Sequence, residues 1–175
     1  MRRPRYFLHT LLGVTIAAAG CSSSEPSAPQ QQDPQPTPVY SLSGSLSATL
    51  LQCSPQTALS VTKTIGPNGG ELWLGKHYLV VPKGALTQKV TITGEVVTGT
   101  TNSVRFYPEG LQLGSGTKLY LSYANCFGIG MLLPKKVVYV SELLSLLEIL
   151  NTVDLSSKQL AVGDLRHFSR YAVAY

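Results

Sequence analysis

The sequence predicts an all-β protein whose folded part is an antiparallel β-sandwich, and three observations lead to this fold class. Short runs of β-branched and aromatic residues recur along the chain, and several alternate between apolar and polar positions. Gly, Pro and Asn residues that favour turns separate these runs at short intervals. The stretch from residue 40 to residue 175 is long enough for one domain with a buried core.

The first twenty residues predict export. Three arginines within the first five residues precede an apolar stretch, residues 6–19, that is shorter than the roughly 20 residues of a membrane-spanning helix. The stretch ends Ala-Ala-Gly-Cys21, which resembles the bacterial lipobox. This resemblance implies that residues 1–20 are a lipoprotein signal peptide and that Cys21 carries the lipid. The alternative is an ordinary signal peptide followed by an unmodified cysteine.

Residues 21–39 predict a tether between the lipidated cysteine and the folded domain. Residues 22–38, SSSEPSAPQQQDPQPTP, are nearly free of large apolar side chains. Such a composition buries too little surface to offset the entropy lost on ordering, and its prolines keep the chain extended. We therefore expect a disordered tether at residues 21–39 and a domain at residues 40–175. Ser22 after the cysteine resembles the sorting signal for the outer membrane in a bacterium that has one.

The charge of the chain does not favour nucleic acid as a partner. The chain has 14 Lys and Arg against 9 Asp and Glu, a net charge of +5. Removal of the three signal-peptide arginines leaves 11 basic against 9 acidic residues, a net charge of only +2. The basic character is therefore mostly a property of the export signal.

Five runs in the domain read as strands. Residues 117–123 alternate, which predicts that Leu119 and Leu121 face the core. Three further runs are rich in β-branched and aromatic residues or alternate, and a short closing strand is expected at the end of the chain. These runs are residues 77–81, 90–93, 136–140 and 171–175.

The ten residues SELLSLLEIL, 141–150, are ambiguous. Their leucines fall near helical spacing, but a helix of two or three turns is marginal without strong packing. We favour a turn at Glu142–Ser145 and a strand at Leu146–Leu150. Turns are also predicted at residues 67–70, 82–84 and 107–110, where Pro precedes Gly.

Cys53 and Cys126 are the two cysteines of the predicted domain. Because export places them in an oxidising compartment, a disulfide between them is the favoured interpretation. The alternative is a pair of buried thiols.

Residues 65–86, IGPNGGELWLGKHYLVVPKGAL, resemble the ZU5 domain, a family that takes its name from a tight-junction scaffold protein and netrin receptors. Residues 106–113, FYPEGLQL, extend this likeness. The resemblance implies a β-sandwich that serves as an interaction module, within a layout similar to small bacterial envelope lipoproteins. It is carried by a glycine-rich start and a Pro-Lys-Gly-Ala end, at Gly66, Gly69, Gly70, Leu72, Leu79, Val81, Pro82, Gly84 and Ala85.

The tripeptide His167-Phe168-Ser169 predicts a second activity. Some signalling proteins with a ZU5 domain cut themselves at a Phe-Ser bond, and a nucleoporin domain does so at His-Phe-Ser. By resemblance, the Ser169 hydroxyl would attack the Phe168 carbonyl and form an ester that water hydrolyses, while His167 accepts the hydroxyl proton. In the alternative interpretation, Phe168 anchors the core and Ser169 is a hydroxyl at a sheet edge.

Other catalytic or ligand sites have little support in the sequence. His77 lacks Cys, Asp or Glu partners at metal-ligand spacing, so we expect no metal and a surface position for this histidine. No cofactor motif appears. Trp73 and several strand tyrosines, Tyr78, Tyr120, Tyr123 and Tyr139, are candidates for a glycan-stacking face if they form an exposed stripe.

The sequence thus favours a non-enzymatic binding or structural module in the bacterial cell envelope, held at the membrane by a lipid on Cys21. The expected partner is an unknown envelope protein or glycan. Self-processing at Phe168–Ser169 and glycan binding are the alternatives.

Overall fold

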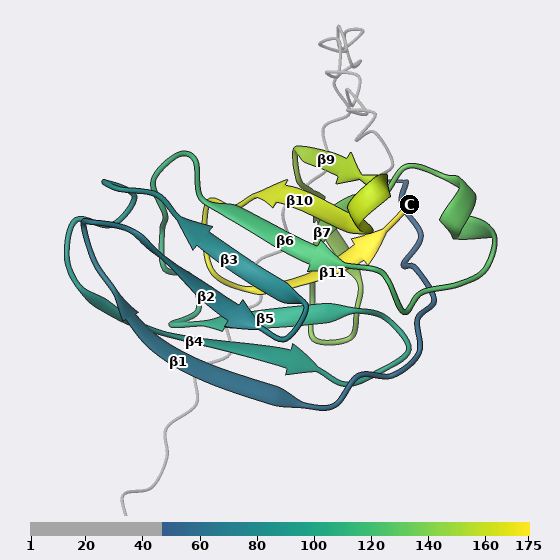
Figure 1. Cartoon of the computed structure of the whole chain (residues 1–175), viewed down its shortest axis with the longest axis horizontal. Helices are drawn as coiled ribbons and strands as arrows, with labels where there is room; N and C mark the ends of the chain where they lie inside the picture. Colours follow the sequence, from purple (N-terminus) through teal and green to yellow (C-terminus); the bar gives the residue numbers. More distant parts are fainter. Residues whose placement is uncertain (1–46) are drawn as a thin grey trace, which may run out of the picture. The chain divides into compact units, whose positions relative to one another are not determined.

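The computed structural model describes residues 47–175, which form eleven strands and two 3₁₀ helices (Figure 1). The strands make two antiparallel sheets, of six and five strands, that pack against each other. The predicted all-β sandwich is therefore confirmed.

The six-stranded sheet has the order β1-β4-β5-β11-β7-β8. The last strand of the chain, β11, lies inside this sheet, hydrogen-bonded to β5 on one side and β7 on the other. The strands are β1 (Leu59–Ile65), β4 (Val90–Val97), β5 (Ser103–Tyr107), β7 (Lys136–Val140), β8 (Leu146–Ile149) and β11 (Arg170–Ala174).

The five-stranded sheet has the order β2-β3-β6-β10-β9, so β2 and β9 are its edges. Its strands are β2 (Gly70–Leu74), β3 (His77–Val81), β6 (Lys118–Ser122), β9 (Thr152–Leu155) and β10 (Leu160–Asp164). The two 3₁₀ helices, η1 (Ile129–Leu132) and η2 (Ser156–Lys158), lie in the connections β6–β7 and β9–β10.

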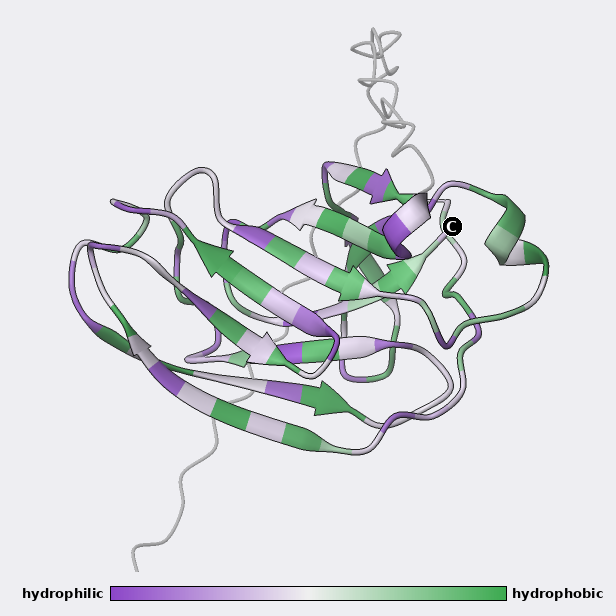
Figure 2. Ribbon diagram, in the orientation of Figure 1, coloured by the Kyte–Doolittle hydropathy of each residue, from purple (hydrophilic) through white to green (hydrophobic). Residues whose placement is uncertain are grey.

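Alternation of side chains along the strands builds the core, and Figure 2 shows it as alternating hydropathy along the ribbons. Leu119 and Leu121 are fully buried, as predicted. Gly94 lies where the two sheets approach closely, because a Cβ there would stand 2.8 Å from Leu74 and 2.9 Å from Leu72. Other fully buried residues that fill the core are Leu72, Leu79, Ile92, Val104, Phe106, Phe168 and Val173.

The ambiguous segment 141–150 contains no helix. Ser141 donates its backbone N–H to the Ser145 carbonyl at 2.9 Å, Leu144 has a φ of 62°, and β8 follows. Leu146 and Leu147 fall in this strand because pairing with β7 satisfies the backbone, and Leu146 and Ile149 are half-buried there. The predicted turn and strand are confirmed.

Candidate functional site

Three aromatic side chains form a row across the outward face of the five-stranded sheet. Trp73 of β2 pairs with Tyr78 of β3, and Tyr78 pairs with Tyr120 of β6. Directly paired residues of antiparallel strands point to the same face. Trp73 is 54% exposed and the two tyrosines are half-buried, so these three residues form an exposed aromatic stripe. The other two predicted members lie elsewhere, because Tyr123 is buried and Tyr139 belongs to β7 of the other sheet.

The rings of this row stack on one another. The ring centroids of Trp73 and Tyr78 are 4.2 Å apart with planes 20° from parallel, and those of Tyr78 and Tyr120 are 4.2 Å apart at 10°. Because neighbouring strands are about 4.8 Å apart, rings stacked in this direction stand on edge above the sheet. Their faces cover each other. In residues 47–175 no further ring stacks on the opposite face of Trp73.

A polar row runs beside the aromatic row on the same sheet face. The Trp73 indole donates Nε1–H to a Glu71 carboxylate oxygen at 2.9 Å, which fixes the ring at the sheet edge. Lys118 forms an ion pair with Asp164, and Asn151 donates to the same carboxylate at 2.7 Å. These two hydrogen bonds lower the pKa of Asp164, so it is a carboxylate at neutral pH. The face therefore combines aromatic edges with fixed charges of both signs.

Such a face has the composition of a binding surface. Trp and Tyr are enriched among the residues that dominate binding energy at protein interfaces, and charges around them contribute specificity. A pyranose ring needs an open aromatic face, and the stack leaves only its two outer ring faces, those of Trp73 and Tyr120, uncovered by another ring. The geometry therefore favours a protein partner over an extended sugar chain.

The predicted cleavage residues, 167–169, lie immediately before β11. Phe168 is fully buried and packs on Phe106 with ring centroids 5.3 Å apart, so the core position of Phe168 is confirmed. The Phe168 carbonyl accepts a hydrogen bond from the Gly110 backbone N–H at 2.8 Å. Ser169 is also buried, and its carbonyl accepts the Phe106 N–H at 3.0 Å. The expectation of an edge hydroxyl at Ser169 is wrong, because β11 enters the interior of the sheet rather than its rim.

The His167 ring is directed toward two tyrosines. Its Nδ1 lies 3.3 Å from the Tyr171 hydroxyl, which donates to the His167 carbonyl at 2.6 Å. The ring also packs edge-on against Tyr139, with centroids 5.1 Å apart. Among the hydrogen bonds of residues 47–175, none joins His167 to the Ser169 hydroxyl. A base and its nucleophile need such a contact, so the residues are neighbours without forming a catalytic pair here.

The disulfide is formed. Cys53 and Cys126 are joined, with 73 residues of sequence separation. The bridge ties the segment that precedes β1 to the connection after β6. Two backbone hydrogen bonds flank the disulfide and join the same two segments. The Ser54 N–H donates to the Asn125 carbonyl at 3.0 Å, and the Phe127 N–H donates to the Gln52 carbonyl at 2.9 Å. The predicted pairing of Cys53 with Cys126 is confirmed.

His77 is buried, so the expected surface position is wrong. It is fully covered, and it occupies the inward positions of β3 together with Leu79 and Val81. The two-residue period of that strand was the signal that sequence reasoning missed. Burial, and to a lesser degree Lys76, lowers the pKa of His77 to about 4, so the imidazole is neutral at physiological pH.

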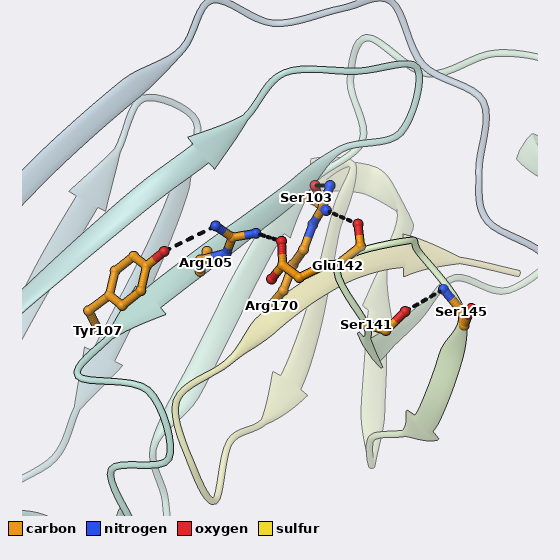
Figure 3. A network of polar contacts seen from close by, with 7 residues as sticks. All are labelled: Ser103, Arg105, Tyr107, Ser141, Glu142, Ser145 and Arg170. Carbon is orange, nitrogen blue, oxygen red and sulfur yellow. Dashed lines mark hydrogen bonds and ion pairs between the residues drawn. The ribbon is translucent and has the colours of Figure 1, made fainter. Parts of the chain in front are cut away.

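A charged network on the outward face of the six-stranded sheet was also missed (Figure 3). Arg105 forms an ion pair with Glu142 and donates to the Tyr107 hydroxyl at 3.0 Å. Arg170 donates to the Glu142 backbone carbonyl at 2.9 Å and to the Ser103 hydroxyl at 3.1 Å. The network joins β5, β11 and the β7–β8 turn.

Cys21 lies outside the described residues. Within residues 47–175 no helix is long and apolar enough to cross a membrane, and no three His, Cys, Asp or Glu residues are grouped to hold a metal. No protein-family model matches the sequence of the chain, and no curated protein sequence matches it either. The likeness to the ZU5 domain stays a prediction.

Proposed function

We propose that this chain is a lipoprotein of the bacterial cell envelope whose β-sandwich is a non-enzymatic binding module for another envelope protein. The lipid on Cys21 holds the module at the membrane, which is the outer membrane in a bacterium that has two. Trp73, Tyr78 and Tyr120 form the contact surface. The observation that carries the proposal is the 54% exposure of Trp73 at the end of a fixed aromatic stack.

The stack supports this role because it is already ordered. Trp73 and Tyr78 hold each other, and Glu71 accepts the indole N–H, so these side chains lose little rotamer freedom when a partner binds. Large apolar side chains that remain exposed and rigid are typical anchors of protein interfaces. The ZU5-like segment includes β2 and β3, which agrees with an interaction module.

The test uses Trp73→Ala in the full-length lipoprotein. Chemical cross-linking in intact cells, followed by quantitative mass spectrometry, should recover a partner with the wild type at several times the yield given by Trp73→Ala. Val153→Ala is the matched control, because Val153 is 57% exposed on β9 at the opposite edge of the same sheet. Equal recovery with Trp73→Ala and wild type would contradict the contact surface.

Anchoring has its own test. Cells fed a clickable palmitate analogue should label the wild type and leave Cys21→Ala unlabelled. Label that persists in Cys21→Ala, or that is lacking in the wild type, would contradict the lipid anchor.

Glycan binding is the second candidate, favoured by the open face of Trp73. This residue is the only tryptophan among the 175 residues, so its fluorescence reports on the candidate surface alone. Saturable quenching or a blue shift on titration with envelope polysaccharide would support a sugar ligand. An unchanged spectrum at saturating polysaccharide would exclude Trp73 as a sugar platform.

A further inference from the structure

A cluster of exposed apolar side chains occupies the connection between β6 and β7. Figure 2 shows this connection, around η1, as a hydrophobic projection at the edge of the molecule. We call residues 127–133 the apolar loop. Its most exposed members are Phe127 at 55%, Ile129 at 75%, Leu132 at 85% and Leu133 at 48%. Folding leaves these side chains in water, which is unfavourable unless another surface covers them.

The apolar loop is held in place from its inner side. Gly130 is buried so tightly that a Cβ there would stand 2.4 Å from the Tyr175 ring and 2.8 Å from Leu51. Lys135 closes the loop, because its ammonium group donates to the Met131 carbonyl at 3.2 Å and to the Leu133 carbonyl. The Cys53–Cys126 disulfide lies at its base. The side chains are thus displayed by a fixed backbone.

The loop lies beside the point where the upstream chain enters the domain. Phe127 donates its N–H to the Gln52 carbonyl at 2.9 Å, and Lys136, just after the loop, donates to the Ser47 carbonyl at 3.4 Å. Figure 1 shows the segment after residue 47 running near η1. A lipid attached upstream would therefore connect to the domain at the edge that carries the apolar loop.

The charge around the loop suits an anionic lipid surface. Lys136 follows the loop, and exposed Lys158 of η2 belongs to a segment whose Ser156 and Gln159 line the same surface depression as Leu132 and Leu133. Asp154, the acidic residue of that depression, is engaged by the Tyr123 hydroxyl at 2.6 Å and the Lys135 N–H at 2.8 Å. Apolar side chains rimmed by lysines are the chemistry of an interfacial membrane contact.

We propose that the apolar loop docks on the lipid bilayer and inserts Phe127, Ile129, Leu132 and Leu133 into the headgroup region. The inference rests on the proposed lipid anchor, which brings this edge to the membrane. The anchor alone leaves the domain free to rotate on its tether, whereas the docked loop gives it one orientation. The docked domain then presents the same face of the sandwich to any partner protein.

Residues 40–175 without a lipid are the material for the test. The eleven strands, the disulfide and the core all lie within residues 47–175, so residues 40–175 include every contact on which the described fold depends. The protein is sedimented with vesicles of phosphatidylethanolamine and phosphatidylglycerol at millimolar lipid. The wild type should pellet with the vesicles. Ile129→Ser/Leu132→Ser should lower its partition by at least about tenfold, since both side chains leave the apolar phase.

Leu143→Ser is the matched control, because Leu143 is 90% exposed in the β7–β8 turn, outside the loop, and the substitution should leave partition unchanged. A second readout places a tryptophan in the loop, as Leu132→Trp in a Trp73→Phe background, and expects a blue shift on vesicle addition. A wild type that stays in the supernatant, or equal pelleting of the loop variant, would overturn the proposal. A dimer lost in the loop variant, without vesicle binding, would assign the loop to contact between copies instead.

The vesicle assay contains neither Cys21 nor a partner protein. Its result therefore tests membrane binding by the apolar loop alone and does not depend on the proposed function. Palmitate labelling at Cys21 combined with no vesicle binding would leave the anchor standing and remove only the docked loop.

Discussion

The Nδ1 atom of His77 accepts a hydrogen bond from the backbone N–H of Ser122 at 3.0 Å, which joins β3 to the end of β6 inside the fold. Because Nδ1 is the acceptor, the neutral ring carries its proton on Nε2 and donates it to the Gln56 side-chain oxygen at 3.1 Å. A second proton on the ring would remove the acceptor and leave a charge in the core. The sandwich therefore depends on a neutral His77.

We predict that the domain loses stability in mildly acidic solution. Burial lowers the pKa of His77 to about 4 in the folded chain, whereas the unfolded chain keeps a value near 6.5. Between these values the unfolded chain binds a proton that the folded chain does not, so the free energy of unfolding falls as the pH falls. The full effect is about 3 kcal/mol. Urea denaturation at pH 7.5 and at pH 4.5 measures it.

His77→Gln supplies the comparison, because an amide does not titrate in this range. Its free energy of unfolding should change less between the two pH values than that of the wild type. Equal pH dependence in both proteins would remove His77 as the cause.

We predict that Arg170→Ala destabilises the fold far more than Glu142→Gln. Arg170 is buried, and its loss leaves the Ser103 hydroxyl and the Glu142 carbonyl without donors, at a cost of about 2–3 kcal/mol. The Glu142 side chain is 67% exposed, so exchange of its carboxylate for an amide should cost about 1 kcal/mol or less. Urea denaturation of both variants should separate the two values, and similar losses would contradict the assignment of the stability to Arg170.

We predict that the Cys53–Cys126 bridge contributes about 4 kcal/mol of stability, because it restricts a long loop of the unfolded chain. Cys53→Ala/Cys126→Ala should show this loss in urea, and a reductant should bring the wild type to the same value. If the double variant loses less than about 1 kcal/mol, restriction of the unfolded chain is not how the bridge acts.

We predict that the Phe168–Ser169 peptide bond stays intact. The bond lies in a hydrogen-bonded segment, and the His167 ring contacts Tyr139 and Tyr171 rather than the Ser169 hydroxyl. Mass spectrometry of residues 40–175 in denaturant should give one uncut mass, identical to that of Ser169→Ala after allowance for the substitution. A fragment that ends at Phe168 in the wild type alone would establish self-cleavage, with the Gly110 N–H as the donor to the carbonyl that is attacked.

Much of the fold was predictable because strands and turns leave local signals. The alternation at residues 117–123 placed Leu119 and Leu121 in the core, and Pro-Gly pairs marked the turns. The oxidising compartment inferred from the export signal led to the disulfide. The same local reasoning located the closing strand to within one residue, since the structure has it at Arg170–Ala174.

The candidate site was predictable only as a set of residue types. Trp73, Tyr78 and Tyr120 come from three strands, and their stacking depends on the register of β2 against β3 and of β3 against β6. A shift by one residue would turn these rings into the core, and no local pattern fixes which strands pair.

The sequence by itself thus determined where six of the strands lie (β3, β4, β6, β7, β8 and β11), which side of β6 is buried, and that Cys53 and Cys126 are available to pair. Only the tertiary structure decided that β11 inserts between β5 and β7, that Arg105 and Arg170 share Glu142, and that the apolar loop lies beside residue 52. The physical reason is that side-chain alternation is a property of neighbours along the chain. Strand order and register instead follow from the burial and hydrogen bonding of segments that are far apart in sequence.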